Sequence, residues 1–419
     1  MKKVLILNYY WPPSGGSGVQ RWVRFAANLQ EHGFLTTIIT THNGDYPSVD
    51  VSLLDAVPDN VKVIRTKTPV FGKFFKKLTG SKTDIPYGSL EISENDGLMK
   101  RILVFIRLNL VIPDTRRIWN KYALKAAQQE LVTDSYDCII TSGPPHSTHL
   151  VGYKLQKELK VKWLADFRDP WTKMGYLKNV KRSKFAELID KYYENKIVEN
   201  CDILISATKL IKKDFGNLDK IKIIRNGYIE SNFEHKPAKH KGNEFTINFF
   251  GTMPVESNPV YVLLAVYHLR ETGIENIKMN FYGNICNEIK EELTKIDTDN
   301  LVTFHPYIPH AEMLGKMIES SMLLLVINNV KNNEGIITGK IFEYLGSRRP
   351  IVALGPLSGE AAEILNETQS GKIFDYKDIE GISKFIRNNI NDDFAPTEDS
   401  KKYSAKVLTR RLAEVMKGM

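Results

Sequence analysis

Short aliphatic runs alternating with longer helical patterns constrain the fold of this chain more than any other feature. In the first half, such runs lie at Val4–Leu7, Thr37–Thr40, Val61–Arg65, Cys138–Thr141, Lys162–Ala165 and Ile203–Ser206. The rhythm restarts in the second half at Thr246–Phe250, Lys278–Phe281, Val302–Phe304, Met322–Ile327 and Pro350–Ala353. Apolar runs of this length, separated by helices, are typical of buried parallel strands. The pattern therefore predicts an α/β chain with two successive parallel sheets.

Chain length and one polar segment divide this pattern into domains. The chain has 419 residues, more than the roughly 250–300 at which a single hydrophobic core stops growing. Residues 231–244, SNFEHKPAKHKGNE, are polar and lysine-rich, a composition typical of a linker. We expect Rossmann-like domains over residues 1–230 and 245–399, joined by this linker. Residues 400–419 are expected to form a helix that could dock back on the first domain.

Composition narrows the class of protein. Cys138, Cys201 and Cys286 have neither metal-ligand nor disulfide spacing, and the opening MKKVLILNYYWPP has too short an apolar run for a secretory signal. These features predict a cytoplasmic location. No apolar stretch approaches the roughly 18 residues that span a bilayer, so any membrane contact is expected to be peripheral. The net charge of +9 indicates an anionic partner, which could be nucleic acid, a membrane face or a phosphorylated small molecule.

A glycine-rich loop follows the first predicted strand. Gly15, Gly16 and Gly18 lie between that strand and an amphipathic helix in WPPSGGSGVQRWVRFAANL. Glycines let backbone N–H groups approach a phosphate at the positive N-terminus of a helix. The spacing departs from GxGxxG, and no acidic residue ends the second strand, which disfavours a dinucleotide site. A phosphate-binding loop and a plain flexible turn are both open readings of this segment.

Polar side chains follow the fourth and fifth predicted strands. His146 lies in SGPPHSTHL after the fourth strand, and Asp166, Arg168 and Asp169 lie in ADFRDPW after the fifth. Ligands of open parallel sheets bind at this carboxyl edge. We predict that His146 exchanges a proton or donates a hydrogen bond there, whereas His149 belongs to the next helix. The Asp-Arg-Asp group could be an acceptor and phosphate site or a structural ion-pair cluster.

Six residues of the second half lie where a strand ends or a helix begins. They are Gly251 and Thr252 at the end of INFFGTM, and Thr338, Gly339, Lys340 and Glu343 in GIITGKIFEYLGS. A helix N-terminus with a lysine in its first turn suits a diphosphate. A carboxylate one turn later can accept hydrogen bonds from both hydroxyls of a ribose. The alternative is a capped surface helix whose lysine and glutamate are merely solvated.

These segments together resemble glycosyltransferase family 4, whose members are retaining enzymes of GT-B fold. Within it they resemble the branch that transfers sugars in capsule, O-antigen and related cell-surface glycans. The resemblance covers nearly the whole chain and rests on PPSGGSGVQRW, TSGPPHSTHL, ADFRDPW, RNGY, FFGTM and GKIFEYLGSRRPIVALGP followed by Glu363. It implies two Rossmann-like domains that face a cleft. The first domain would bind the acceptor and the second would bind the nucleotide sugar.

The resemblance also implies roles for individual residues. It places Gly15 and Gly16 near the donor phosphates and Glu343 on the ribose. The residues that would hold the diphosphate are Gly251, Thr252, Thr338, Gly339 and Lys340. The family commonly has two glutamates separated by seven residues, whereas eight separate Glu334 from Glu343, so only Glu343 takes a role. The usual Arg/Lys pair after the Gly-Thr strand is missing, which leaves Lys340 and Arg225 as candidates to neutralise the leaving group.

The expected reaction moves a hexosyl or N-acetylhexosaminyl group from a nucleoside-diphosphate sugar, with UDP favoured, to a glycan or lipid-linked glycan hydroxyl. Catalytic roles are expected for His146, Asp166, Arg168 and Lys340, and an acceptor-side role for Asp169. No metal or other cofactor is expected, because helix ends and one lysine can stabilise the departing diphosphate. The string Asp297–Asp299 is interpreted as a polar connection.

Three other functions are alternatives to sugar transfer. A sugar-nucleotide epimerase of the same bilobal shape would need no acceptor. A catalytically silent scaffold that binds sugar nucleotides is consistent with the altered glutamate spacing. A nucleic-acid-binding protein is disfavoured, because the basic residues belong to no recognition module.

Residues 71–112 mix apolar and basic side chains. The apolar ones are Phe71, Phe74, Phe75, Leu98, Ile102, Val104, Phe105 and Ile106, and the basic ones are Lys73, Lys76, Lys77, Lys100, Arg101 and Arg107. Apolar residues can enter the headgroup boundary while basic residues attract anionic lipid. The segment therefore predicts peripheral contact with an anionic membrane, where a lipid-linked acceptor would be delivered. The alternative is a packed helix whose lysines are solvated.

Overall fold

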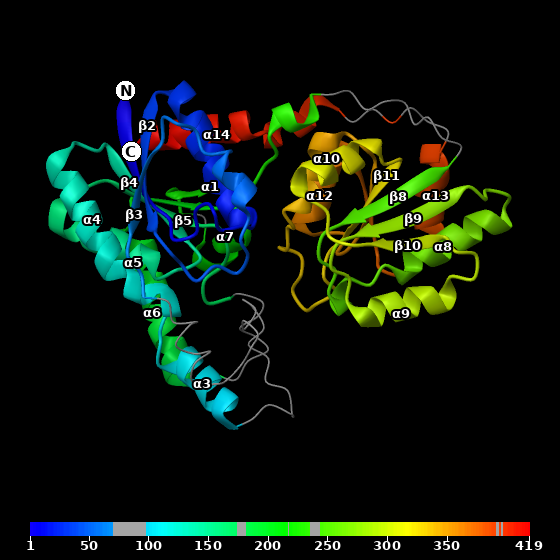
Figure 1. The fold of residues 1–419 in the computed structure, drawn as a ribbon, viewed down its shortest axis with the longest axis horizontal. Coiled ribbons are helices and arrows are strands. Elements are labelled where there is room, and N and C mark those ends of the chain that lie inside the picture. The colour runs from blue at the N-terminus through cyan, green and yellow to red at the C-terminus, as the bar shows by residue number, and fades with distance from the viewer. Residues whose placement is uncertain (70–97, 174–181, 217, 235–243, 391–393, 395–396) are drawn as a thin grey trace. The chain divides into compact units, whose positions relative to one another are not determined.

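The computed structural model describes residues 1–69, 98–173, 182–216, 218–234, 244–390, 394 and 397–419. Its contacts divide the chain into two compact units. One unit comprises Met1–Arg225 and Leu408–Met419, and the other comprises Asn226–Val407. Each unit contains one parallel sheet with helices packed against it (Figure 1). The predicted α/β class with two successive parallel sheets is confirmed.

Within its described residues, the first unit has a seven-stranded parallel sheet of order β3-β2-β1-β4-β5-β6-β7. The strands are β1 (Lys2–Leu7), β2 (Phe34–Thr41), β3 (Lys62–Thr66), β4 (Cys138–Gly143), β5 (Trp163–Phe167), β6 (Ile203–Ser206) and β7 (Ile221–Ile223). The strand order reverses between β1 and β4, and ligands of doubly wound sheets bind outside the carboxyl ends at such a switch point. The apolar runs in the sequence predict the first six strands but not the short edge strand β7.

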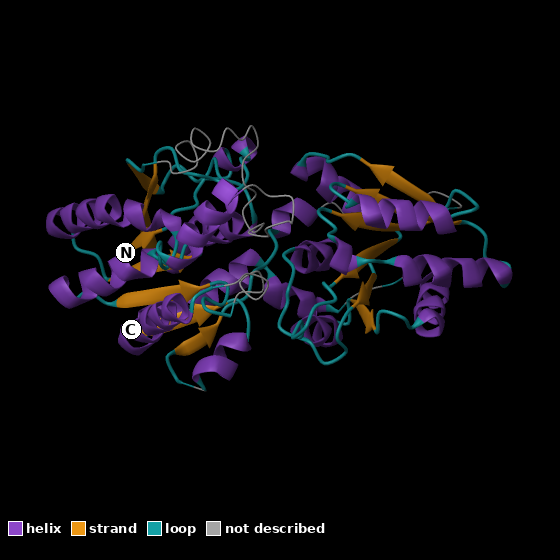
Figure 2. Ribbon diagram, turned by 90° about the horizontal axis from the view of Figure 1, so that it is seen from below, coloured by secondary structure: helices purple, strands orange, loops and turns teal. Residues whose placement is uncertain are grey.

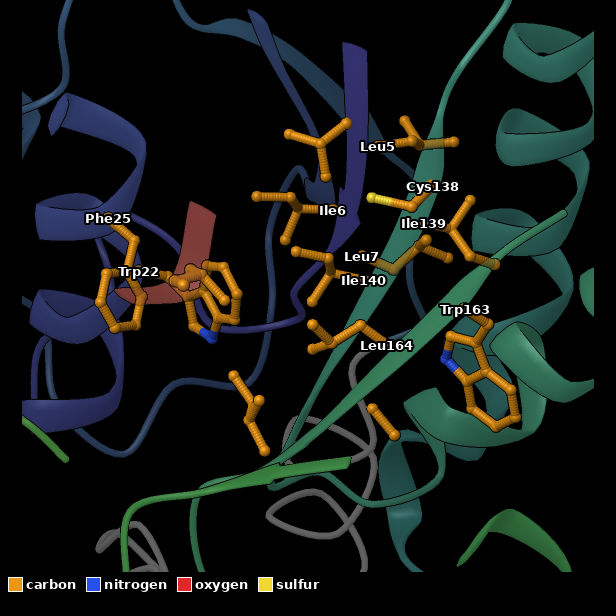
Figure 3. Packing of buried hydrophobic residues seen from close by; sticks show 14 of the residues in the cluster. Leu5, Ile6, Leu7, Trp22, Phe25, Cys138, Ile139, Ile140, Trp163 and Leu164 are labelled. Carbon is orange, nitrogen blue, oxygen red and sulfur yellow. The ribbon is translucent and has the colours of Figure 1, made fainter. Parts of the chain in front are cut away.

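The helices of this unit connect the strands in chain order. They are α1 (Ser17–Leu29), α3 (Leu98–Asn109), α4 (Asn120–Thr133), α5 (Thr148–Leu159), α6 (Lys184–Asn200) and α7 (Leu210–Phe215). The predicted amphipathic helix after the glycine loop is α1, which buries Trp22, Val23 and Ala26. Figure 3 shows Trp22 beside the aliphatic residues of β1 and β4. This packing fixes the start of α1 against the switch point of the sheet.

Within the described residues, the second unit has a six-stranded parallel sheet of order β10-β9-β8-β11-β12-β13. The strands are β8 (Phe245–Phe250), β9 (Ile277–Tyr282), β10 (Val302–His305), β11 (Met322–Val326), β12 (Ile351–Leu354) and β13 (Gly371–Phe374). The order reverses between β8 and β11, so the second switch point lies at the end of β8. The edge strand β13 begins with a glycine, which weakens its sequence signal, and it was not predicted.

Helices cover both faces of the second sheet (Figure 2). They are α8 (Val260–Glu271), α9 (Asn287–Ile296), α10 (His310–Glu319), α11 (Lys340–Ser347), α12 (Glu360–Thr368) and α13 (Ile379–Ile390). The strand β11 shows why both faces are covered, because its successive side chains enter different cores. Leu324 and Val326 pack with α8 and α13, whereas Leu323 and Leu325 pack with α11 and α12. A strand buried on both sides needs the unbroken apolar run seen in the sequence.

The chain returns to the first unit at its end. The last helix, α14 (Ala405–Lys417), buries Leu408, Leu412, Ala413 and Met416 in the core of the first unit (Figure 1). Just before α14, the backbone of Tyr228 exchanges hydrogen bonds of 3.1 and 2.7 Å with Tyr403 and Ala405. The two segments that leave and re-enter the second unit are thus paired. Residues 235–243, most of the predicted linker, lie outside the described part of the chain.

Candidate active site

The glycine loop leads from β1 into α1 at the switch point of the first sheet. Gly16 is the N-cap residue of α1, and no side chain caps the helix. The Gly15 amide donates to the Ser48 carbonyl at 2.9 Å, so this amide is engaged within the loop. The α1 N-terminus has no acidic residue in its first turn. The N-terminal end of a helix carries a partial positive charge, which suits an anion.

The Arg168 side chain lies against this glycine loop. A Cβ atom on Gly18 would fall 1.2 Å from Arg168 Nη1, so no larger residue fits at Gly18 with Arg168 in place. The guanidinium also donates to Asp169 Oδ2 at 3.0 and 2.7 Å. Arg168 and Asp169 therefore sit together at the start of α1, as a partly exposed ion pair.

Asp166 does not join this pair. Its carboxylate is fully buried and accepts from Arg21 at 3.1 and 3.3 Å, from the Trp22 indole at 2.8 Å and from the Ser142 hydroxyl at 3.0 Å. Asp166 and Arg168 thus belong to separate ion pairs, and a catalytic role for Asp166 stays a prediction. The side chain of Asp166, on β5, packs against α1, where the buried Arg21 compensates its charge.

His146 and His149 belong to a buried group of rings after β4 and β5. The His146 ring stacks on Trp171 with centroids 5.0 Å apart and planes 10° apart, and it meets Phe167 edge-on at 5.6 Å. The His149 ring lies 4.6 Å from Phe167. As predicted, His149 belongs to the helix that follows, α5.

Burial determines the charge of these two histidines. It lowers the pKa of His146 to about 3, while the nearby charges of Asp169 and Arg168 oppose each other. Burial also lowers the pKa of His149, helped by His146. Among the described residues, neither ring nitrogen of His146 has a well-aligned hydrogen-bond partner. Both imidazoles are therefore neutral at physiological pH, and His146 can accept or donate a hydrogen bond there.

In the second unit, Lys340 lies across Gly251 at the end of β8. Its ammonium group donates to the Thr252 carbonyl at 3.0 Å and lies 4.3 Å above the Phe249 ring. A Cβ atom on Gly251 would come within 2.6 Å of Lys340 Cε, so glycine is needed for this close approach. Burial lowers the pKa of Lys340 to about 8. Among the described residues, Lys340 forms no ion pair.

Helix α11 begins where the sequence predicted. Gly339 is its N-cap residue, and Lys340 and Glu343 lie in its first turn. The Thr338 hydroxyl just before the helix is buried and has no partner among the described residues. One oxygen of Glu343 lies 2.9 Å from Nε2 of His310, the first residue of α10. The structure thus places Thr338, Gly339, Lys340 and Glu343 at the start of α11, and Lys340 reaches the end of β8.

The string Asp297–Asp299 is engaged within the fold. The Asp297 carboxylate accepts from the amides of Leu301 and Val302 at 2.9 and 2.8 Å, and Asp299 pairs with Arg270 at 3.1 Å. These contacts tie the end of α9 to β10. No group of three or more potential metal-ligating side chains occurs among the described residues.

Helices α3 and α6 of the first unit carry exposed apolar side chains, which are called the apolar face below. Its exposed members are Ile102, Phe105, Ile106 and Leu110 in or just after α3, and Phe185, Leu188 and Tyr192 on α6. Arg101 and Lys184 are exposed beside them. Residues 71–97 of the predicted membrane segment lie outside the described residues. No helix in the described part of the chain is both long enough and apolar enough to cross a bilayer.

Several structurally important partners escaped the sequence analysis. Arg21, which neutralises Asp166, and His310, which contacts Glu343, lie far from their partners in the sequence. Asp190 on α6 accepts from the Trp171 indole at 3.1 Å. Arg21 and Asp190 each lie on the buried side of an amphipathic helix. A charged residue at such a position indicates a buried partner, and this was the sequence signal that could have identified them.

No protein-family model and no curated protein matches this sequence. The structure is similar to sucrose-phosphate synthase from Thermosynechococcus elongatus, with 12% identity, a TM-score of 0.63 and coverage of 100% of this chain and 99% of that chain. A glycosyltransferase from Rickettsia africae gives 13% identity, a TM-score of 0.63 and coverage of 100% and 98%.

A putative UDP-N-acetylglucosamine 2-epimerase from Listeria monocytogenes is also similar in structure. It gives 11% identity, a TM-score of 0.52 and coverage of 100% of this chain and 96% of that chain. Likeness at such low identity establishes architecture and not chemistry. With its two parallel-sheet units, the chain has the GT-B fold.

Proposed function

We propose that this protein is a retaining glycosyltransferase. It moves a hexosyl or N-acetylhexosaminyl group from a UDP-sugar to a hydroxyl of a glycan or lipid-linked glycan in cell-surface polysaccharide synthesis. The GT-B fold shared with a glycosyltransferase supports sugar transfer, and the sequence motifs support the cell-surface branch. The UDP-sugar named for the similar epimerase supports the choice of donor.

The observation that carries this proposal is the setting of Lys340. An ammonium group that is partly buried and has no carboxylate partner among the described residues is costly to keep charged, which agrees with the lowered pKa of Lys340. An anion bound at the α11 N-terminus would offset that cost. Gly251 gives this anion a close approach to the backbone at the end of β8. A diphosphate is the ligand that best matches a lysine, a helix N-terminus and a glycine turn together.

Glu343 lies one helical turn beyond Lys340 and is proposed to bind the ribose. Its carboxylate is mostly buried, which strengthens hydrogen bonds that it accepts from sugar hydroxyls. The contact with His310 fixes where the carboxylate points. The diphosphate and the ribose would then lie along the first turn of α11.

In the reaction, the bond between the anomeric carbon and the diphosphate oxygen breaks, and a bond to the acceptor oxygen forms. The acceptor proton passes to an oxygen of the departing diphosphate. Negative charge grows on that group, and Lys340 with the α11 N-terminus stabilises it. In the first unit, His146 and the Arg168–Asp169 pair are proposed to contact the acceptor, and the glycine loop is proposed to bind a phosphate. Asp166 is proposed to stabilise the fold through its buried ion pair with Arg21.

Peripheral membrane contact is proposed through the apolar face of α3 and α6. Exposed aromatic and aliphatic side chains next to Arg101 and Lys184 fit a bilayer with anionic headgroups. A lipid-linked acceptor would then be held beside the unit that carries His146. The face extends the predicted segment to α6, which the sequence analysis did not include.

The alternative function is epimerisation of the sugar nucleotide, which the similar 2-epimerase structure favours. An epimerase changes the donor sugar when no acceptor is present, whereas a transferase leaves it intact apart from slow hydrolysis. Incubating radiolabelled UDP-sugars with and without a glycolipid extract separates the two. If the UDP-sugar is converted to an isomer when no acceptor is present, the protein is an epimerase and the proposed sugar transfer is wrong.

Replacing Glu343 tests the donor site directly. Glu343→Ala should weaken UDP binding by about 1.5–3 kcal/mol, since it removes charged hydrogen bonds to the ribose. Isothermal calorimetry measures the affinity, and thermal unfolding checks that the fold is intact. Glu312→Ala, an exposed glutamate on α10, is the matched control and should bind UDP normally. Equal affinity of both variants for UDP would remove Glu343 from the site.

A further inference from the structure

His146 is oriented in an unusual way. An imidazole at a reactive site is ordinarily fixed by a hydrogen bond from one ring nitrogen to a carboxylate or carbonyl. Among the described residues, neither nitrogen of His146 has such a well-aligned partner. The ring is 5% exposed and is held by the flat stacking contact with Trp171 and the edge contact with Phe167. The ring also lies beside the backbone of Pro170, the residue before Trp171. Its direction therefore depends on where Pro170 and Trp171 lie.

Trp171 is itself fixed by a single buried carboxylate. Its indole N–H donates to Asp190 Oδ1 at 3.1 Å. The other oxygen, Asp190 Oδ2, accepts from Arg182 Nη2 at 2.5 Å. Trp171, Asp190 and the Arg182 side chain are all more than nine-tenths buried. A buried charge-assisted network of this kind holds its members in one geometry.

The network extends to the end of α3. Arg182 Nε donates to the Leu108 carbonyl at 3.1 Å, and the Ser183 amide donates to Asn109 Oδ1 at 2.6 Å. Leu108 and Asn109 form the last turn of the helix that carries part of the exposed apolar face. A continuous set of hydrogen bonds and one ring stack thus connects α3 with His146.

We propose that Asp190 is a positioning residue for His146. Its carboxylate sets the Trp171 ring on which His146 stacks, and through Arg182 it ties that ring to the end of α3. Asp190 acts on the acceptor side of the proposed transfer reaction, so the kinetic part of this inference rests on the proposed function. The structural part, the placement of Trp171 and His146, does not.

Two double variants test the contact between Asp190 and Trp171. Asp190→Leu with Arg182→Met removes both charges and also the acceptor for the indole N–H. Asp190→Asn with Arg182→Gln also removes both charges, but its amide oxygen still accepts from Trp171. Neither variant leaves a lone buried charge, so both are expected to fold. The Leu/Met variant loses every side-chain hydrogen bond of residues 182 and 190, whereas the Asn/Gln variant keeps groups that can make them, including the acceptor for the Trp171 indole.

Nuclear magnetic resonance gives a readout that does not require activity. The chain has five tryptophans, so 5-fluorotryptophan labelling gives five fluorine signals, and Trp171→Phe assigns the one of interest. The Leu/Met variant should shift or broaden the Trp171 signal and the His146 ring signals, the latter assigned with His146→Gln. The Asn/Gln variant should keep both near their wild-type positions. Unchanged Trp171 and His146 signals in the Leu/Met variant would overturn the proposal.

Kinetics add a second readout. The Leu/Met variant should lose at least about tenfold in kcat, because a misdirected reactive group is costly, while its affinity for UDP stays at the wild-type value. The Asn/Gln variant should recover most of that loss. If wild type transfers sugar and both variants keep full kcat, Asp190 has only a structural role. If wild type transfers no sugar, the proposed function fails and the magnetic resonance comparison decides the positioning role alone.

Discussion

Lys340 holds its ammonium group against a carbonyl and an aromatic face, and burial lowers its pKa to about 8. Because this pKa lies below that of the unfolded chain, the charged form costs folding free energy below about pH 8. That cost fades as the pH rises from about 8 towards the ordinary lysine value. A bound diphosphate would favour the charged form and raise the pKa again.

The affinity for UDP should therefore be greatest below about pH 8. Above that pH it should fall by up to about tenfold per unit, as the free protein loses the Lys340 proton before binding. Calorimetry between pH 7 and pH 9.5 would measure this dependence. Lys340→Arg is the control, because a guanidinium stays charged over this range. The same fall in the arginine variant would assign the titration to another group.

Asp166 and Arg21 allow a second test at the level of single residues. Both side chains are buried, so removing either one leaves an uncompensated charge. Asp166→Asn and Arg21→Met should each lower the free energy of unfolding by about 3–5 kcal/mol. Urea denaturation measures this loss. A variant of Asp166 with normal stability and no transfer activity would instead return that carboxylate to the catalytic site.

The sequence predicted which residues lie at strand ends and helix starts, but it did not predict which side chains they contact. The start of α11 and the end of β8 both have local signals, whereas only the family resemblance grouped Lys340 with Gly251. The pairing of Asp166 with Arg21 did not, because side chains alternate across a strand and a shift of one residue changes the face. The contact between Glu343 and His310 depends on how two helices pack, which no local pattern specifies.

At the scale of elements, the central strands were predictable because burial on both faces demands continuous apolar runs. The edge strands β7 and β13 lack such runs, since each has one neighbour and needs less burial. On helices α3 and α6, in contrast, apolar residues of the sequence are exposed in the structure. Their exposed apolar residues look like core residues in the sequence, and only the structure separates buried Val104 from exposed Phe105.

The apolar face of α3 and α6 gives an element-scale prediction. Phe105→Ser with Leu188→Ser should reduce flotation with vesicles containing anionic lipid, because two exposed apolar anchors are lost. Wild-type binding should also fall at high salt, which screens the basic residues. Val132→Ser, an exposed valine on α4, is the matched control. Equal flotation of the double variant and the wild type would exclude this face as the membrane contact.

At the scale of the whole molecule, α14 joins the last residues to the core of the first unit. Leu412→Ala should destabilise that unit by about 2–5 kcal/mol, because the side chain is fully buried. Limited proteolysis followed by mass spectrometry should show earlier cleavage within residues 1–225 than within the second unit. Arg410→Ala, an exposed position on the same helix, should cleave as wild type does. Unaltered cleavage in the leucine variant would mean that α14 adds little to the first unit.

The position of α14 has a consequence for biosynthesis. A ribosome completes the strands of the first unit long before it reaches Leu408, and it makes the whole second unit in between. Domains generally fold during synthesis in order from the N-terminus. Here the surface that receives Leu412 and Met416 stays uncovered until α14 has been made. Nascent chains halted before residue 405 should therefore bind chaperones that recognise exposed apolar surface. Chains that extend through α14 should no longer bind these chaperones.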